Sequence, residues 1–349
     1  MAERAKRRGR DGAANAVDAK PTLRTIAEIT GLAVTTVSRA LSNAPQLSQE
    51  TRDRVRRVAD EIGYLPDRAA LRLKTGRTNV VSLVLDPHRE ILGFGTSIIT
   101  GLTLALRDTP LHIIVTPTFE NRPLADPVEF IIRNRLADGL IFTRTEPFDP
   151  RVRLLLERSF PFITHGRTEF LTPHAYVDFD NSAFAYEATR RLIAKGRRKV
   201  TMIMPPRRLT FGQHLLHGFM SAVREAGIEH EIPETVTLDS SAGAIREYVS
   251  ARADQDGAPD AHVCCGEVSA LATIAGLGGR GLLHGRDYDI VAKQTSRLLT
   301  DIEPQVETIY EDLAAAGEEM GRLLIRRIAG EAPETLQVLQ PPRFDIPAD

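Results

Sequence analysis

Apolar residues at helical spacing mark three short segments in the first part of the chain. The first, residues 23–29, follows Thr22, a residue type that favours the N-cap of a helix. The second covers about residues 34–41, and the third runs over residues 49–62 after Ser48, a second N-cap type. Three short helices joined by tight turns predict a helix-turn-helix unit.

From residue 80 the pattern changes to short apolar runs that alternate with amphipathic segments. The predicted strands are residues 80–85, 111–115, 139–143, 162–164, 175–177, 200–204, 262–265 and 289–292. The predicted helices are residues 98–107, 128–134, 152–158, 183–195, 212–226, 244–253, 268–277 and 313–328. Repeated strand–helix units predict parallel sheets covered by helices on both faces. A body of this length should divide into two doubly wound α/β lobes with a ligand cleft between them.

These patterns divide the chain into five parts. We expect a disordered basic arm over residues 1–20, a helix-turn-helix head over 21–65 and a linker over 66–78 that becomes helical only when packed. The two-lobed body follows over residues 79–340, and residues 341–349 form a tail. The fold class is therefore multidomain, with a small all-α head and an α/β body.

Charge separates the head from the body. The 349 residues carry 45 Lys and Arg against 46 Asp and Glu, a net charge of −1. Residues 1–79 hold 16 basic and 9 acidic residues, a net charge of +7, whereas the remainder carries −8. A basic head favours an anionic partner, although a solvated surface of uneven charge would have the same composition.

Other features exclude several protein classes. A hydrophobic fraction of 42% argues against a disordered chain, and no apolar run reaches the roughly 20 residues of a membrane span. The basic N-terminus has no apolar stretch behind it, so we expect neither a secretory signal nor a membrane location. The two cysteines, Cys264 and Cys265, are adjacent and provide neither a disulfide nor a zinc set. A cytoplasmic location is the expectation.

The longest sequence motifs carry a family resemblance. They are TLRTIAEITGLAVTTVSRALS at residues 22–42, TRDRV at 51–55, GYLP at 63–66, RLKTGRT at 72–78, ADGLIF at 137–142 and VDFDN at 177–181. In order and spacing they resemble the LacI/GalR family of bacterial transcription regulators over about residues 21 to 340. The resemblance implies a periplasmic-binding-protein-like body and no enzymatic activity. It also implies a homodimer that reads a palindromic double-stranded DNA operator and is controlled by a sugar or sugar derivative between the lobes, most often as a repressor.

The resemblance places the second helix in the major groove of DNA. Val34 and Thr35 would then contact bases, through a thymine methyl and a hydrogen bond. Arg39 fits guanine O6 and N7, and a phosphate contact is the alternative. Thr36, Ser38 and Ser42 are predicted to contact phosphate. Thr22, at the start of the first helix, is a further predicted DNA contact.

Two linker residues complete the predicted DNA site. Leu73 matches the family's apolar wedge, which enters the minor groove and kinks the duplex. Packing against a neighbouring helix is the less favoured alternative for this leucine. Lys74 beside it is predicted to contact phosphate or the edge of the groove.

The predicted effector site departs from the family pattern. Lys293 and Gln294 stand where many members have an aromatic residue and an Asp, and His214 lies where an Arg is common. Arg167 occupies a region that is often acidic, and Phe94 could stack on a ligand ring or simply pack in the core. Because these changes make the site less acidic, a phosphate-bearing effector is one hypothesis. A neutral sugar or polyol is the default.

Rival patterns are weak. Gly276–Gly281 fits G-x-G-x-x-G but ends a predicted helix instead of opening one, so no cofactor is predicted. His214 and His217 have the spacing of metal ligands but no evident third ligand, and packing is favoured. Asp178 and Asp180 alternate along a strand and could both enter the cleft as an acid/base pair, yet no catalytic residue is predicted. The tail lacks a leucine heptad, so we expect a dimer and no tetramer.

Overall fold

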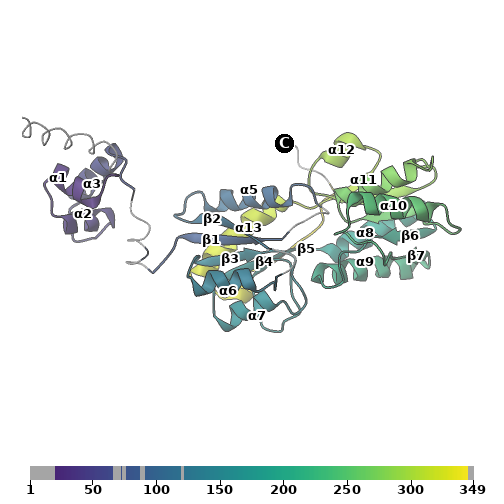
Figure 1. Cartoon of the computed structure of the whole chain (residues 1–349), viewed down its shortest axis with the longest axis horizontal. Helices are drawn as coiled ribbons and strands as arrows, with labels where there is room; N and C mark the ends of the chain where they lie inside the picture. Colours follow the sequence, from purple (N-terminus) through teal and green to yellow (C-terminus); the bar gives the residue numbers. More distant parts are fainter. Residues whose placement is uncertain (1–19, 66–71, 73–75, 87–90, 119–121, 345–349) are drawn as a thin grey trace, which may run out of the picture. The chain divides into compact units, whose positions relative to one another are not determined.

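The computed structural model describes residues 20–65, 72, 76–86, 91–118 and 122–344. The chain forms two compact units, residues 1–78 and 79–349, which we treat separately (Figure 1). Within the described residues, no helix is both long and apolar enough to cross a membrane.

The head consists of α1 (Leu23–Thr30), α2 (Val34–Leu41) and α3 (Gln49–Glu61). The side chains of Thr22 and Thr25 form a capping box at the start of α1. Gly31 ends that helix with a φ of 68°, a conformation that costs glycine little. The core of the head joins apolar residues of all three helices: Ile26, Ala27, Val37, Ala40, Val55 and Ala59. The helix-turn-helix prediction is therefore confirmed.

The first lobe of the body is a six-stranded parallel sheet in the order β11-β5-β4-β3-β1-β2. Its strands are β1 (Val80–Leu85), β2 (His112–Pro117), β3 (Gly139–Phe142), β4 (Phe162–His165), β5 (Tyr176–Phe179) and β11 (Gln337–Gln340). Its helices are α5 (Phe94–Leu106), α6 (Asp126–Arg133), α7 (Pro150–Glu157) and α13 (Leu313–Ile328), with the 3-10 turn η1 (Pro333–Thr335). Two separate apolar clusters fill the lobe: one contains residues of α5 and α13, and the other contains residues of α6 and α7.

The second lobe is a five-stranded parallel sheet in the order β10-β9-β8-β6-β7. Its strands are β6 (Lys199–Met202), β7 (Glu229–Glu231), β8 (Ala261–Cys264), β9 (Asp289–Gln294) and β10 (Glu307–Tyr310). Its helices are α8 (Asn181–Ala194), α9 (Thr210–Ala226), α10 (Ala242–Ala253), α11 (Glu267–Gly278) and α12 (Leu298–Ile302). The chain passes from the first lobe to the second after β5 and returns between β10 and α13 (Figure 1).

The two doubly wound lobes agree with the predicted fold class, and every predicted helix and strand of the body has a counterpart. Five short elements were not predicted: β7, β10, β11, α12 and the 3-10 turn η1. The strands β7 and β11 are polar edge strands without an apolar run, which explains why the pattern missed them. Gly278 is the last residue of α11, so the glycine-rich segment ends a helix and does not open one.

Candidate DNA-binding and effector sites

Helix α2 presents its predicted base-reading residues to solvent. Val34, Thr35 and Arg39 are exposed, and the exposed fraction of Val34 is 42%. Val37 and Ala40 on the opposite side are fully buried in the core of the head. The helix is thus anchored by one face while an apolar group, a hydroxyl and a guanidinium remain available on the other.

The remaining predicted DNA residues differ in their surroundings. Thr36 and Ser38 are half-buried, and the hydroxyl of Ser42 donates a 2.8 Å hydrogen bond to the carbonyl oxygen of Ser38. Thr22 is exposed, but its hydroxyl already accepts a hydrogen bond from the amide of Thr25 in the capping box. Leu73 and Lys74 lie outside the described residues.

A small cavity lined by both polar and apolar side chains lies between the two lobes of the body, and we call it the inner cavity. Its volume is about 50 Å³. It is lined from both lobes by Ile91, Phe94, Arg144, Thr145, His165, Gly166, Asp178, Asn181, Phe211, Cys265, Lys293 and Glu311. Most of these residues lie at or just after the carboxyl ends of parallel strands, the edge where α/β folds bind ligands.

Lys293 enters the inner cavity as part of a buried ion pair. Its Nζ lies 2.9 Å from Glu311 Oε2 and donates a 2.6 Å hydrogen bond to Asn181 Oδ1. The same ammonium lies 4.5 Å from the centre of the Phe179 ring, within cation–π range. Lys293 and Glu311 can both be charged although they are buried, because each is stabilised by an opposite charge or a hydrogen bond.

Arg167 and His214 meet Asp178 at the side of the inner cavity. Arg167 Nε donates a 2.7 Å hydrogen bond to Asp178 Oδ2, and Arg167 Nη2 lies 3.4 Å from His214 Nδ1. Burial and the neighbouring Arg167 charge lower the pKa of His214. The imidazole is therefore held neutral near pH 7, with one nitrogen able to accept a hydrogen bond.

His165 supplies a polar group that the protein itself leaves without a hydrogen bond. Its Nε2 is buried, forms no hydrogen bond and lies 3.9 Å from Glu311 Oε1. Its ring meets that of Phe94 edge to face, with the centroids 5.7 Å apart. Burial lowers the pKa of His165, so this nitrogen is part of a neutral ring that a ligand hydroxyl could contact.

The structure brings four of the five predicted effector residues together and separates the fifth. Phe94 and Lys293 line the inner cavity, and Arg167 and His214 contact Asp178 in its wall. Gln294 is fully buried beside it, where its side-chain amide donates hydrogen bonds to Thr300 and Thr308. Phe94 also belongs to the apolar core, so its two predicted roles coexist.

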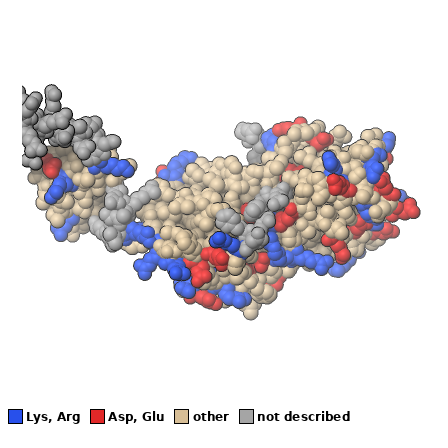
Figure 2. All heavy atoms as spheres, in the orientation of Figure 1, with Lys and Arg blue, Asp and Glu red and all other residues tan. Residues whose placement is uncertain are grey.

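Sequence reasoning missed several cavity residues. His165, Asn181 and Glu311 were not predicted, although a lysine inside a buried strand signals a missing carboxylate partner. Asp178 and Asp180 do not form a pair, because Asp180 accepts a hydrogen bond from Ala183 N at the start of α8. Both basic and acidic side chains are spread over the visible surface of the body (Figure 2).

Comparisons with known proteins agree with this architecture. Residues 22–67 match the family described as bacterial regulatory proteins, lacI family, and residues 189–346 match the periplasmic binding protein-like domain. The transcriptional regulator AglR of Rhizobium meliloti is 30% identical over 330 residues, which cover 89% of this chain and 90% of AglR.

Two solved structures share the fold. A complex of the transcriptional regulator CelR with cellobiose has a TM-score of 0.66 at 27% identity, covering 94% of this chain and 99% of that chain. The lac repressor dimer bound to operator and the anti-inducer ONPF has a TM-score of 0.80 at 19% identity, covering 93% and 97%. The chain therefore belongs to the LacI family of bacterial regulatory proteins, which are DNA-binding transcriptional regulators and not enzymes.

Proposed function

We propose that the protein is a transcriptional repressor that binds a palindromic operator as a homodimer in the bacterial cytoplasm and is controlled by a small molecule in the inner cavity. The observation that carries the proposal is the exposed face of α2, where Val34, Thr35 and Arg39 stand free of the head's core. Groups of this kind read base edges in the major groove. In a reporter assay, deletion of the head should abolish operator-dependent repression.

The linker contributes to the proposal through Leu73 and Lys74. Leu73→Ala should reduce the bend of the bound operator and the specific affinity, because an apolar wedge stabilises kinked DNA. Binding to random DNA should change little. Gel-shift bending assays measure both, and an equal loss on random DNA would contradict the wedge.

The dimer surface we propose includes apolar side chains at one edge of the first lobe. Ile114 and Val115 on the edge strand β2 are 50% and 45% exposed, and Leu104 on α5 is 45% exposed. Exposed apolar groups on an edge strand are a common feature of protein interfaces. Sedimentation velocity at micromolar concentration should show a dimer, and Ile114→Lys should shift it to monomer. A stable tetramer would contradict the proposal.

We favour a neutral, hydroxyl-rich effector such as a sugar or polyol over a sugar phosphate. The three cations around the inner cavity, Arg144, Arg167 and Lys293, each contact a carboxylate of this chain. This pairing removes the excess positive charge that an anionic ligand would require. Paired carboxylates, amides and neutral imidazoles offer both donors and acceptors to hydroxyl groups. The cellobiose bound to the related CelR is a ligand of this class.

A thermal-shift screen of the full chain with sugars, polyols and sugar phosphates tests the effector class. A ligand that binds should raise the melting temperature through mass action. Titration calorimetry then compares a neutral disaccharide with its phosphate. Tight binding of the phosphate alone would overturn the neutral assignment. The ligand found should weaken operator binding if the protein is an inducible repressor.

A further inference from the structure

Arg144 joins the two lobes through an ion pair. The residue follows β3 in the first lobe, and Asp239 precedes α10 in the second. Arg144 Nη2 lies 2.7 Å from Asp239 Oδ1 and 2.6 Å from Asp239 Oδ2. The Arg144 side chain is only 5% exposed, so this contact is screened far less than a surface pair.

The same side chain lies between two cavities. Arg144 lines the inner cavity of about 50 Å³ and also an outer cavity of about 1240 Å³. Asp239 and Arg208 line only the outer cavity. Pockets that hold small ligands usually measure roughly 300–1,000 Å³, so the inner cavity by itself is too small for a sugar ring.

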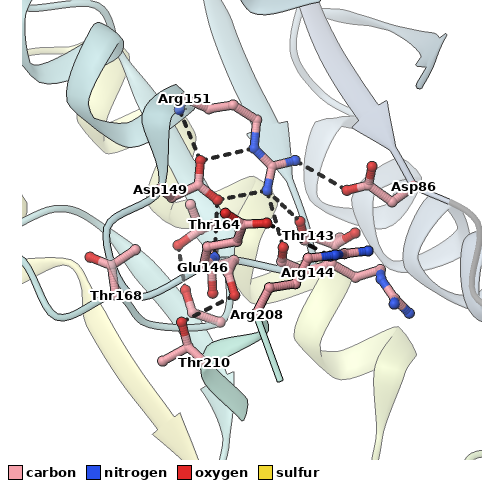
Figure 3. A network of polar contacts seen from close by, with 12 residues as sticks. Asp86, Thr143, Arg144, Glu146, Asp149, Arg151, Thr164, Thr168, Arg208 and Thr210 are labelled. Carbon is pink, nitrogen blue, oxygen red and sulfur yellow. Dashed lines mark hydrogen bonds and ion pairs between the residues drawn. The ribbon is translucent and has the colours of Figure 1, made fainter. Parts of the chain in front are cut away.

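The backbone of Arg144 is fixed by a buried network centred on Arg151 (Figure 3). Arg151 is fully buried, and its guanidinium donates hydrogen bonds to the carbonyl oxygens of Thr143 and Arg144 at 3.2 and 3.1 Å. It also donates to both carboxylate oxygens of Asp149 and, at 3.1 Å, to Asp86. This buried network, which we call the pedestal, therefore ties two loops of the first lobe, the one after β1 and the one between β3 and α7, to one guanidinium.

The pedestal stabilises an unusual backbone conformation at Arg144. Arg144 has a φ of 54°, in the left-handed region that non-glycine residues rarely adopt. Such a conformation costs free energy and persists where neighbours over-determine it, often at functional sites. With its carbonyl held by Arg151, the residue can change the direction of its side chain while its backbone stays in place.

We propose that Arg144 is a gate between the two cavities and that Asp239 holds the gate shut when no effector is bound. Release from Asp239 swings the guanidinium aside and merges the inner and outer cavities into one site. That site accepts a hydroxyl-rich ligand longer than a single sugar ring, whose hydroxyls then accept hydrogen bonds from the freed guanidinium. The inference rests on the proposed effector role of the inner cavity, but its test needs no effector.

Cys265 reports on the gate because it lines the inner cavity, whereas Cys264 lines a separate cavity inside the second lobe. Both are buried, and they are the two cysteines of the chain. The experiment measures the rate of N-ethylmaleimide labelling of the full chain by mass spectrometry. Cys264→Ser isolates Cys265, and Cys265→Ser isolates Cys264.

Asp239→Asn should speed the labelling of Cys265 about tenfold or more and leave the labelling of Cys264 unchanged. Arg144→Ala should also speed the labelling of Cys265 alone. Combining the two substitutions should add little, because each of them removes the same Arg144–Asp239 ion pair. Arg197→Gln is the matched control, since Arg197 pairs with Asp289 within the second lobe and should change neither rate.

Two results would overturn the gate. Labelling of Cys265 that is the same in wild type, Asp239→Asn and Arg144→Ala would show that Arg144 does not restrict access. Equal acceleration of both cysteines would show that the ion pair only stabilises the fold. Failure of the sugar screen would leave the labelling result intact, so the gate and the effector class fail separately.

Discussion

The exposed face of α2 and the inner cavity use polar side chains in opposite ways. On α2, the side chains of Thr35 and Arg39 are exposed to solvent and available to a partner outside the chain. In the cavity, Lys293 and Asp178 are buried and already paired with Glu311 and Arg167. An exposed group costs the folded state little, whereas a buried charge must be compensated before any ligand arrives. Substitutions should therefore affect recognition in the head and stability in the body.

The largest effect is expected from Glu311→Gln, which leaves the Lys293 ammonium buried without its carboxylate. We expect a loss of about 3–5 kcal/mol in the free energy of unfolding, measured by urea denaturation of the full chain. Glu318→Gln on α13 is the control, because its partner Arg322 is exposed and the pair is worth at most about 1 kcal/mol. A similar small loss for both variants would break the comparison between buried and exposed charges.

The next effect concerns pH. Burial lowers the pKa of His262 to about 4, so the unfolded chain binds a proton that the folded body excludes. Stability should fall as pH drops from 6.5 to 4, by roughly 3 kcal/mol for this residue at about 1.36 kcal/mol per pKa unit. Denaturation at several pH values should show a weaker slope in His262→Phe. Residues 1–65 contain no histidine, so the head should not share this slope.

A smaller effect, on binding alone, is expected for Arg39→Ala. Loss of an exposed guanidinium should cost about 1–3 kcal/mol of specific DNA affinity and relax the preference at one base pair. Fluorescence anisotropy on a site selected from random DNA measures both quantities. The melting temperature should not change, because Arg39 is exposed. Uniform weakening on all sequences would instead assign Arg39 to a phosphate.

The smallest effect is expected for Thr22→Ala, which removes the capping box of α1. Such caps contribute about 1 kcal/mol, and the loss should be confined to the head. Circular dichroism of the thermal transition compares Thr22→Ala with Thr22→Ser, which retains the hydroxyl. Equal stability of the two variants would mean that the cap contributes nothing.

The sequence anticipated these two regions to different extents. Helix α2 was predicted over its full length, because helical periodicity alone separates Val37 and Ala40 from the exposed positions. In the cavity, the residue types and positions of Lys293 and Arg167 suggested a surplus of positive charge. In the structure this positive charge is neutralised, because Glu311 lies beside Lys293 and Asp178 lies beside Arg167.

Gln294 illustrates the same limit. Its position after Lys293 predicted an effector contact, yet β9 extends through residue 294 and its side chain binds Thr300 and Thr308. Successive residues of a strand point to opposite faces, so Lys293 and Gln294 cannot both enter one cavity. The sequence pattern ended this strand at residue 292, two residues too early, and so placed Gln294 in a loop. Element boundaries are the least certain part of a sequence pattern.

By itself the sequence determined the order of helices and strands, the helix-turn-helix head, the two-lobed body and the family, because local periodicity and long motifs carry that information. Only the tertiary structure decided which side chains meet. Arg144 and Asp239 are 95 residues apart, and Lys293 and Asn181 are 112 apart, so no local pattern links them. Their pairing depends on how two parallel sheets bring the carboxyl ends of their strands together, and that edge is where this protein's chemistry lies.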